Sequence, residues 1–211
     1  MTAIDGSSVA GTSGGDGPAE VAPAPEPEAG GGADRDRARP ARWVWPAAYA
    51  LSAAALFFCY LRISGTQPVT SDGASQALQA WDMLHGNWLL KGWTVTDVSF
   101  YTTELPEYVL VEIVRGFGAS DVHIAAALTY TLLVVLAGLL AKGGKKGKEG
   151  LVRVLIASGI MIAPQVGHGA FILLLAPDHT GTGVPVLVTW LLLDRAPRRW
   201  WVPVLTCLTL T

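Results

Sequence analysis

Long apolar runs alternate with shorter polar segments from residue 43 to the end of the chain. A helix rises about 1.5 Å per residue, so about 20 apolar residues cross a hydrocarbon core of roughly 30 Å. Pro164 and Gly167 favour a kink or a break in the third run. The pattern predicts membrane-spanning helices at about 43–63, 123–141, 151–175, 183–193 and 200–211.

The last apolar run is short. It offers 12 residues, 200–211, which give a helix of only about 18 Å. We therefore expect a truncated fifth span, and a chain that is the N-terminal part of a longer protein.

The segment 64–122 is too polar to span a membrane, and we expect it to form an outer loop. Apolar residues recur there at helical spacing in two places. The first predicted helix has Ser71 as its N-cap and ends near Gly86, and the second begins near Leu105-Pro106 and ends at Gly116. Both should be amphipathic helices lying parallel to the membrane surface. The apolar positions of the second are Tyr108, Val109, Ile113 and Val114.

Composition agrees with this division of the chain. Hydrophobic residues make up 51% and charged residues 15%, a balance that favours membrane helices over an ordinary soluble enzyme. Residues 1–41 are rich in Gly, Ala, Pro and Ser and should form a disordered tail. No large basic face is present for nucleic acid, and Cys59 and Cys207 lie apart in apolar runs, so they indicate no disulfide framework or metal site.

Basic clusters predict the orientation. They lie just before the first apolar run, at 142–148 and at 195–199. Lys and Arg favour the cytoplasmic side, and one orientation, with the N-terminus inside, places all of these clusters there. The fold class is therefore all-α, a polytopic transmembrane helix bundle. High Ala, Gly and Arg content favours a bacterial source, hence the bacterial cytoplasmic (inner) membrane.

Polar candidates for chemistry gather in the outer segments. Asp178 and His179 would hold a divalent cation or a lipid phosphate, although a metal would need about two more ligands. The alternative is that Asp178 only caps the fourth span. Glu104 and Glu107 are acidic candidates whose simpler role is to complement a helix dipole. His168 lies near the outer end of the third span, where an ionisable residue marks a functional site or is satisfied by a neighbouring helix.

Several segments together resemble one family over about 43–141. A basic tail and one span precede an acidic residue, Asp72, and an Ala-rich helix that ends in Trp81-Asp82-Met83-Leu84-His85-Gly86-Asn87. Glu104-Leu105-Pro106 then leads into a helix ending in Arg115-Gly116-Phe117-Gly118. This layout resembles the N-terminal part of the GT-C-type membrane glycosyltransferases, which include protein mannosyltransferases and aminoarabinose transferases. The family usually has a second carboxylate next to the first, where this chain has Gly73.

The resemblance implies an activity. Asp72 would be the general base that activates an acceptor hydroxyl, while the sugar leaves a polyprenyl-phosphate donor on the outer face of the membrane. Asp178 and His179 would lie near the donor phosphate. The simpler role of Asp72 is to begin a helix. The sequence specifies neither the sugar nor the acceptor.

A second function class stays open. A non-enzymatic polytopic protein, such as a transporter half or a scaffold, would have membrane lipids as its main partners. Transporters place polar substrate sites near the middle of the membrane on broken helices. The expected spans here are nearly all apolar in the middle, and only 164–169 departs from this pattern.

Overall fold

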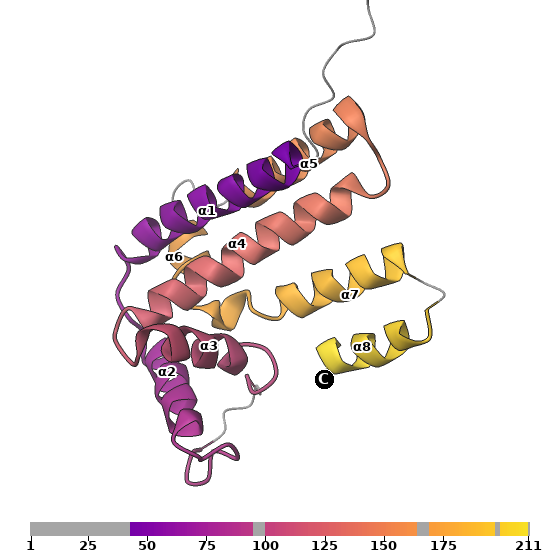
Figure 1. Cartoon of the computed structure of the whole chain (residues 1–211). Helices are drawn as coiled ribbons and strands as arrows, with labels where there is room; N and C mark the ends of the chain where they lie inside the picture. Colours follow the sequence, from indigo (N-terminus) through magenta and orange to yellow (C-terminus); the bar gives the residue numbers. More distant parts are fainter. Residues whose placement is uncertain (1–42, 95–99, 164–168, 197–198, 211) are drawn as a thin grey trace, which may run out of the picture. The chain divides into compact units, whose positions relative to one another are not determined.

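The computed structural model describes residues 43–94, 100–163, 169–196 and 199–210. Every regular element in these described ranges is helical (Figure 1). The expected tail, 1–41, and His168 lie outside them. The elements are α1 Val44–Ser64, α2 Ser71–Leu84, α3 Leu105–Arg115, α4 Asp121–Lys142, α5 Gly147–Ile162, α6 Gly169–Leu173, the 3-10 helix η2 Pro177–His179, α7 Gly183–Arg195 and α8 Trp201–Leu210.

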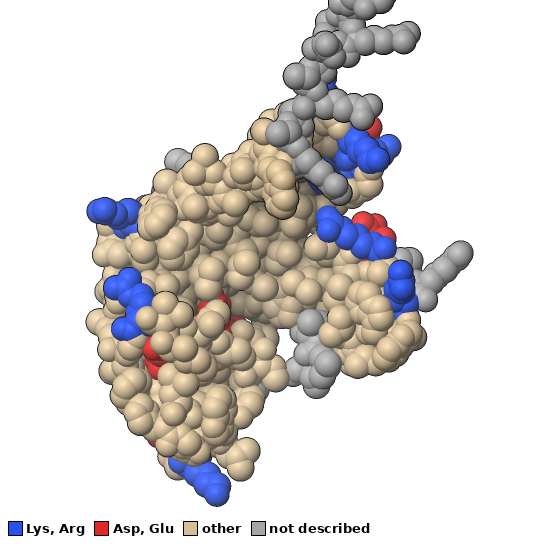
Figure 2. Space-filling model, viewed as in Figure 1, with Lys and Arg blue, Asp and Glu red and all other residues tan. Residues whose placement is uncertain are grey.

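Within the described residues, two helices, α1 and α4, are long and apolar enough to cross a membrane. They have 21 and 22 residues, or about 32 and 33 Å at 1.5 Å per residue. Helix formation is thus confirmed over the first two predicted runs. The face shown in Figure 2 is formed almost wholly by uncharged side chains where it covers α1, α4 and α7. Lys and Arg gather where α4 ends and α5 begins.

The third apolar run is not one continuous helix. Helix α5 ends at Ile162 and α6 begins at Gly169, in the same run in which the sequence favours a kink or a break. The interruption contains Pro164, which has no N–H to donate, and Gly167; both lie outside the described residues. Helix α7 covers the fourth run and α8 covers most of the fifth.

Helices α1 and α4 pack side by side in opposite directions. At one end the Ser64 hydroxyl lies 3.1 Å from Nδ1 of His123. At the other end the ammonium of Lys142 lies over the Tyr49 ring, 5.2 Å from its centre. Between these contacts the rings of Tyr60 and Tyr130 meet edge to face at 5.3 Å. The end of α1 is therefore level with the start of α4.

Helix α5 returns along α4. The Tyr130 hydroxyl donates to the Met161 carbonyl at 2.7 Å. Gly138 allows the close approach, because a methyl group there would lie only 3.3 Å from a Val154 methyl and 3.4 Å from the Ser158 hydroxyl.

Local signals explain where α2 and α3 begin and end. The Thr70 side chain accepts the N–H of Gly73 at 3.3 Å, and Thr70 has the extended backbone of an N-cap. Ser71 is thus the first helical residue, and the prediction of Ser71 as the cap is wrong by one position. Pro106 stands in the first turn of α3, and Gly116 ends it with φ of +80°, as expected for residues that start and stop helices.

Candidate functional site

Helix α3 buries its acidic side and exposes much of its apolar side. Glu104 is 0% exposed and Glu112 3%, whereas Ile113 is 65% exposed and Val114 75%. Tyr108, expected on the same apolar face as Ile113 and Val114, is fully buried. Leu105 and Ala77 of α2 pack with Tyr108 in one core cluster. The sequence pattern located the helix correctly, but Tyr108 lies on its buried side rather than with Ile113 and Val114.

The start of α3 lies against the turn before α7. The Glu104 carboxyl fills the space where a side chain on Gly181 would stand: an added methyl would lie 2.7 Å from the Glu104 Cδ. Burial, with a smaller contribution from the negative charges of Asp178 and Glu107, raises the pKa of Glu104 to about 7. The tertiary structure thus brings together Glu104, Glu107 and Asp178, all of them site candidates from the sequence.

Glu107 extends this acidic group toward α4. Its Oε2 accepts a hydrogen bond of 2.5 Å from the hydroxyl of Thr129, two turns into α4. Burial raises the pKa of Glu107 to about 7, although the bond from Thr129 works in the opposite direction. Burial also raises the pKa of the Tyr108 phenol, with Asp178 and Glu107 adding to the effect. In the described part of the chain, the Tyr108 hydroxyl and one oxygen each of Glu104 and Glu107 have no hydrogen-bond partner. A water or a ligand is the usual partner of such buried groups.

A second acidic pair, which the sequence analysis did not single out, lies at the other end of α3. Burial and, to a lesser extent, the negative charge of Asp121 raise the pKa of Glu112 to about 7. Asp121 in turn accepts the Gly118 N–H at 2.6 Å at the start of α4. The spacing in the sequence does place Glu112 with the other candidates. Glu104, Tyr108 and Glu112 recur every four residues and so share one side of a helix.

Asp72 lies in the first turn of α2 and is exposed. Its neighbour Gly73 packs tightly: an added methyl would lie 2.8 Å from a Val122 methyl and 3.3 Å from Cβ of Ala176. Ala176 directly precedes η2, which carries Asp178. Glycine at this position therefore lets the start of α2 approach both α4 and the segment that leads to Asp178.

Asp178 does not cap α7, so the alternative prediction that it only caps the fourth span is wrong. It lies inside η2, and the residue before α7 is Thr182. The backbone of His179 ends η2, but its side chain is outside the described part. Among the described residues, no three His, Cys, Asp or Glu side chains gather in a way that could hold a metal ion.

The segment 81–87, which contributed to the family resemblance, forms the end of α2 and the turn that follows it. Asp82 accepts hydrogen bonds from the Trp93 indole at 2.9 Å and from the Asn87 amide at 2.5 Å. The hydrogen bond from Trp93 and, to a smaller extent, the bond from Asn87 hold the pKa of Asp82 below its usual value. Gly86 supplies the positive φ of +101° that the turn requires. Asp82 thus has a structural role in closing the loop after α2.

No protein family, curated protein or solved structure matches this chain. A functional assignment therefore depends on the geometry of the site. Asp72, Glu104, Glu107 and Asp178 come from three separate segments that all pack along the first half of α4.

The raised pKa of Glu107 predicts how stability depends on pH. Folded Glu107 holds its proton to about pH 7, whereas the unfolded chain loses it near 4.5. The folded state therefore binds more protons between these values, and the free energy of unfolding falls as pH rises from about 4.5 to about 7. The melting temperature in detergent should therefore fall between pH 5 and 8. We expect this fall to be smaller in Glu107→Gln, because the glutamine stays neutral over the whole range. Glu149→Gln on the exposed surface of α5 is the control, and an equal slope in wild type and Glu107→Gln would contradict the assignment.

Proposed function

We propose that this chain forms part of a membrane glycosyltransferase that moves a sugar from a polyprenyl-phosphate donor to an acceptor on the outer face of the bacterial cytoplasmic membrane. One observation carries the proposal. The start of α2 with Asp72, the start of α3 with Glu104, and η2 with Asp178 pack against the first half of α4. Carboxylates from distant parts of the sequence thus share one end of the bundle.

The exposed side chains support a membrane location. On α3 and just after it, Leu110, Ile113, Val114 and Phe117 form an exposed apolar stripe at helical spacing. The Phe117 ring lies 5.4 Å from that of Trp81, so the stripe continues onto α2. A helix that buries acids and exposes apolar residues fits a surface where lipid, rather than water, is the solvent. In our proposal the stripe rests on the outer leaflet, with the N-terminus of the chain in the cytoplasm.

The proposed chemistry uses the exposed and the buried carboxyl groups differently. Asp72, as general base, takes the proton of the acceptor hydroxyl as the new C–O bond forms at the anomeric carbon. The bond from that carbon to the donor phosphate breaks on the opposite side, so the configuration inverts and polyprenyl phosphate leaves. Glu104 and Glu107, with pKa values of about 7, are in part protonated at neutral pH. A protonated carboxyl donates a hydrogen bond to a phosphate, whereas a carboxylate repels it.

One observation favours a second candidate, a proton-coupled transporter half. Glu107 is hydrogen-bonded to Thr129 inside a helix that is long enough to span the membrane. Titratable carboxyl groups at such positions also occur in proton relays. The exposed Asp72 has no place in that mechanism, so the two functions differ in whether Asp72 matters.

The test is a transfer assay. Membranes with and without the protein are incubated with radiolabelled polyprenyl-phosphate sugars, and radiolabel is followed from the lipid to an acceptor fraction. Transfer that depends on the protein supports the proposal. Absence of transfer from every donor, together with proton-dependent solute uptake into vesicles, would replace it with the transporter.

A further inference from the structure

A cavity lies between α1, α4 and α5, away from the acidic site. Its volume is about 320 Å³, within the range of small-molecule sites. The lining is mainly apolar and includes Ala53 and Leu56 of α1, Val134 and Gly138 of α4, and Val154 and Leu155 of α5. Gly138 keeps α4 close to α5 without filling this space.

A second cavity, of about 210 Å³, adjoins the first and has two lysines in its lining. The two share Trp45, Tyr49 and Leu151. The second is also lined by Lys142 and Lys146, at the end of α4 and in the turn that follows. Together they form one groove that is apolar at one end and basic at the other. From Val134 to Lys142 it follows α4 for about 12 Å, close to the thickness of one leaflet of a hydrocarbon core of about 30 Å.

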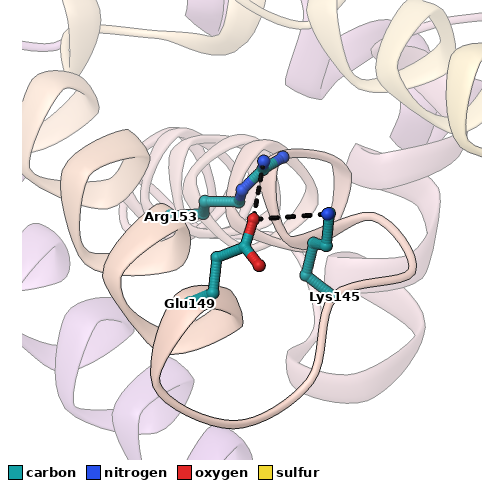
Figure 3. A network of polar contacts seen from close by, with 3 residues as sticks. All are labelled: Lys145, Glu149 and Arg153. Carbon is teal, nitrogen blue, oxygen red and sulfur yellow. Dashed lines mark hydrogen bonds and ion pairs between the residues drawn. The ribbon is translucent and has the colours of Figure 1, made fainter.

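The charges near the basic end are not equivalent. Glu149 forms ion pairs with Lys145 at 3.4 Å and with Arg153 at 2.9 Å (Figure 3). Within the described part of the chain, Lys142 and Lys146 have no such carboxylate partner. The Tyr49 ring instead holds the Lys142 ammonium at the mouth of the groove. The groove therefore ends in positive charge that a bound anion would complement.

We propose that this groove binds an anionic phospholipid, with an acyl chain in the apolar part and the phosphate between Lys142 and Lys146. Lysine ammonium groups attract anionic headgroups at the cytoplasmic surface, and basic pockets between helices bind them specifically. Trp45 and Tyr49, which line both cavities, have the amphipathic rings that favour the boundary between headgroups and chains. This inference rests on the membrane placement in the proposed function but not on sugar transfer.

The experiment is a titration of the detergent-solubilised full chain with phosphatidylglycerol, followed by native mass spectrometry. A lysine close to a bound anionic headgroup contributes about fivefold to the affinity, so Lys142→Gln/Lys146→Gln should bind about thirtyfold more weakly. Ala53→Phe, which fills the apolar part, should weaken binding about tenfold with all lysines in place. Lys148→Gln, a neighbouring exposed lysine outside the groove lining, is the matched control and should bind as wild type. Phosphatidylcholine should bind far more weakly than phosphatidylglycerol.

Several results would overturn the inference. Unchanged binding in Lys142→Gln/Lys146→Gln excludes the phosphate position, and an equal loss in Lys148→Gln means that only general surface charge is involved. Unchanged binding in Ala53→Phe excludes an acyl chain in the groove and leaves a segment of the protein itself as its occupant. Asp72→Asn should retain the lipid, so failure of the sugar-transfer proposal and failure of this one are distinguishable.

Discussion

Asp72→Asn should lower the rate of sugar transfer at least about a hundredfold, because loss of a positioned general base costs about 10² to 10⁴ in rate. Asparagine keeps the size and polarity of the side chain but cannot accept the proton of the acceptor hydroxyl. The measurement is the initial rate of radiolabel transfer in membranes that contain equal amounts of wild-type and variant protein.

The alternative role for Asp72 predicts a different result. A carboxylate in the first turn of a helix contributes about 0.3–1 kcal/mol through the helix dipole, so its loss would change stability slightly and transfer hardly at all. Glu149→Gln is the matched control, since Glu149 also lies in the first turn of a helix and is exposed. If transfer by Asp72→Asn equals that of wild type, Asp72 is only a helix-dipole partner and the proposed base is wrong.

Gly181→Ala should destabilise the protein by about 1–3 kcal/mol, the usual effect of adding a group to a filled site. The new methyl would stand 2.7 Å from the Glu104 Cδ and also against the nearer carboxyl oxygen. Glu104 is fully buried, so its side chain cannot swing into solvent to make room. Thermal unfolding in detergent measures the effect.

A double-mutant cycle shows whether the two side chains compete for one space. Glu104→Ala removes the atoms that the new methyl would meet, so adding Gly181→Ala to it should cost much less than in wild type. Gly159→Ala is the control, because its methyl meets no neighbouring described atom beyond the local helix backbone and alanine favours a helix. Equal stability of Gly181→Ala and wild type would show that the start of α3 does not pack against this turn.

Neutralising the partly buried Glu107 should alter the charge of the site without removing a side chain from it. Glu107→Gln retains an oxygen that can accept from Thr129, yet removes the titration expected near pH 7. Glu107→Gln therefore tests the pH dependence with little change in packing. A smaller residue such as Ala would change the titration and the packing together.

The sequence by itself determined the helices whose signals are local. The apolar runs behind α1 and α4 have a length set by the rise of a helix, and that length needs no knowledge of neighbours. Pro106 and Gly116 limit α3 because one lacks an N–H and the other accepts a positive φ. Asp72, Glu104, Glu107 and Asp178 were identified as candidates from residue type and position alone.

Only the tertiary structure decided which side of each helix faces the protein and which candidates meet. Helical spacing shows that Glu104, Tyr108 and Glu112 share a side of α3, but spacing is equally compatible with that side facing water or a protein core. The outcome depended on contacts across long sequence separations, such as Glu104 against Gly181 and Gly73 against Ala176. Burial in these contacts, rather than any local feature of α3, is what raises the carboxyl pKa values toward neutrality.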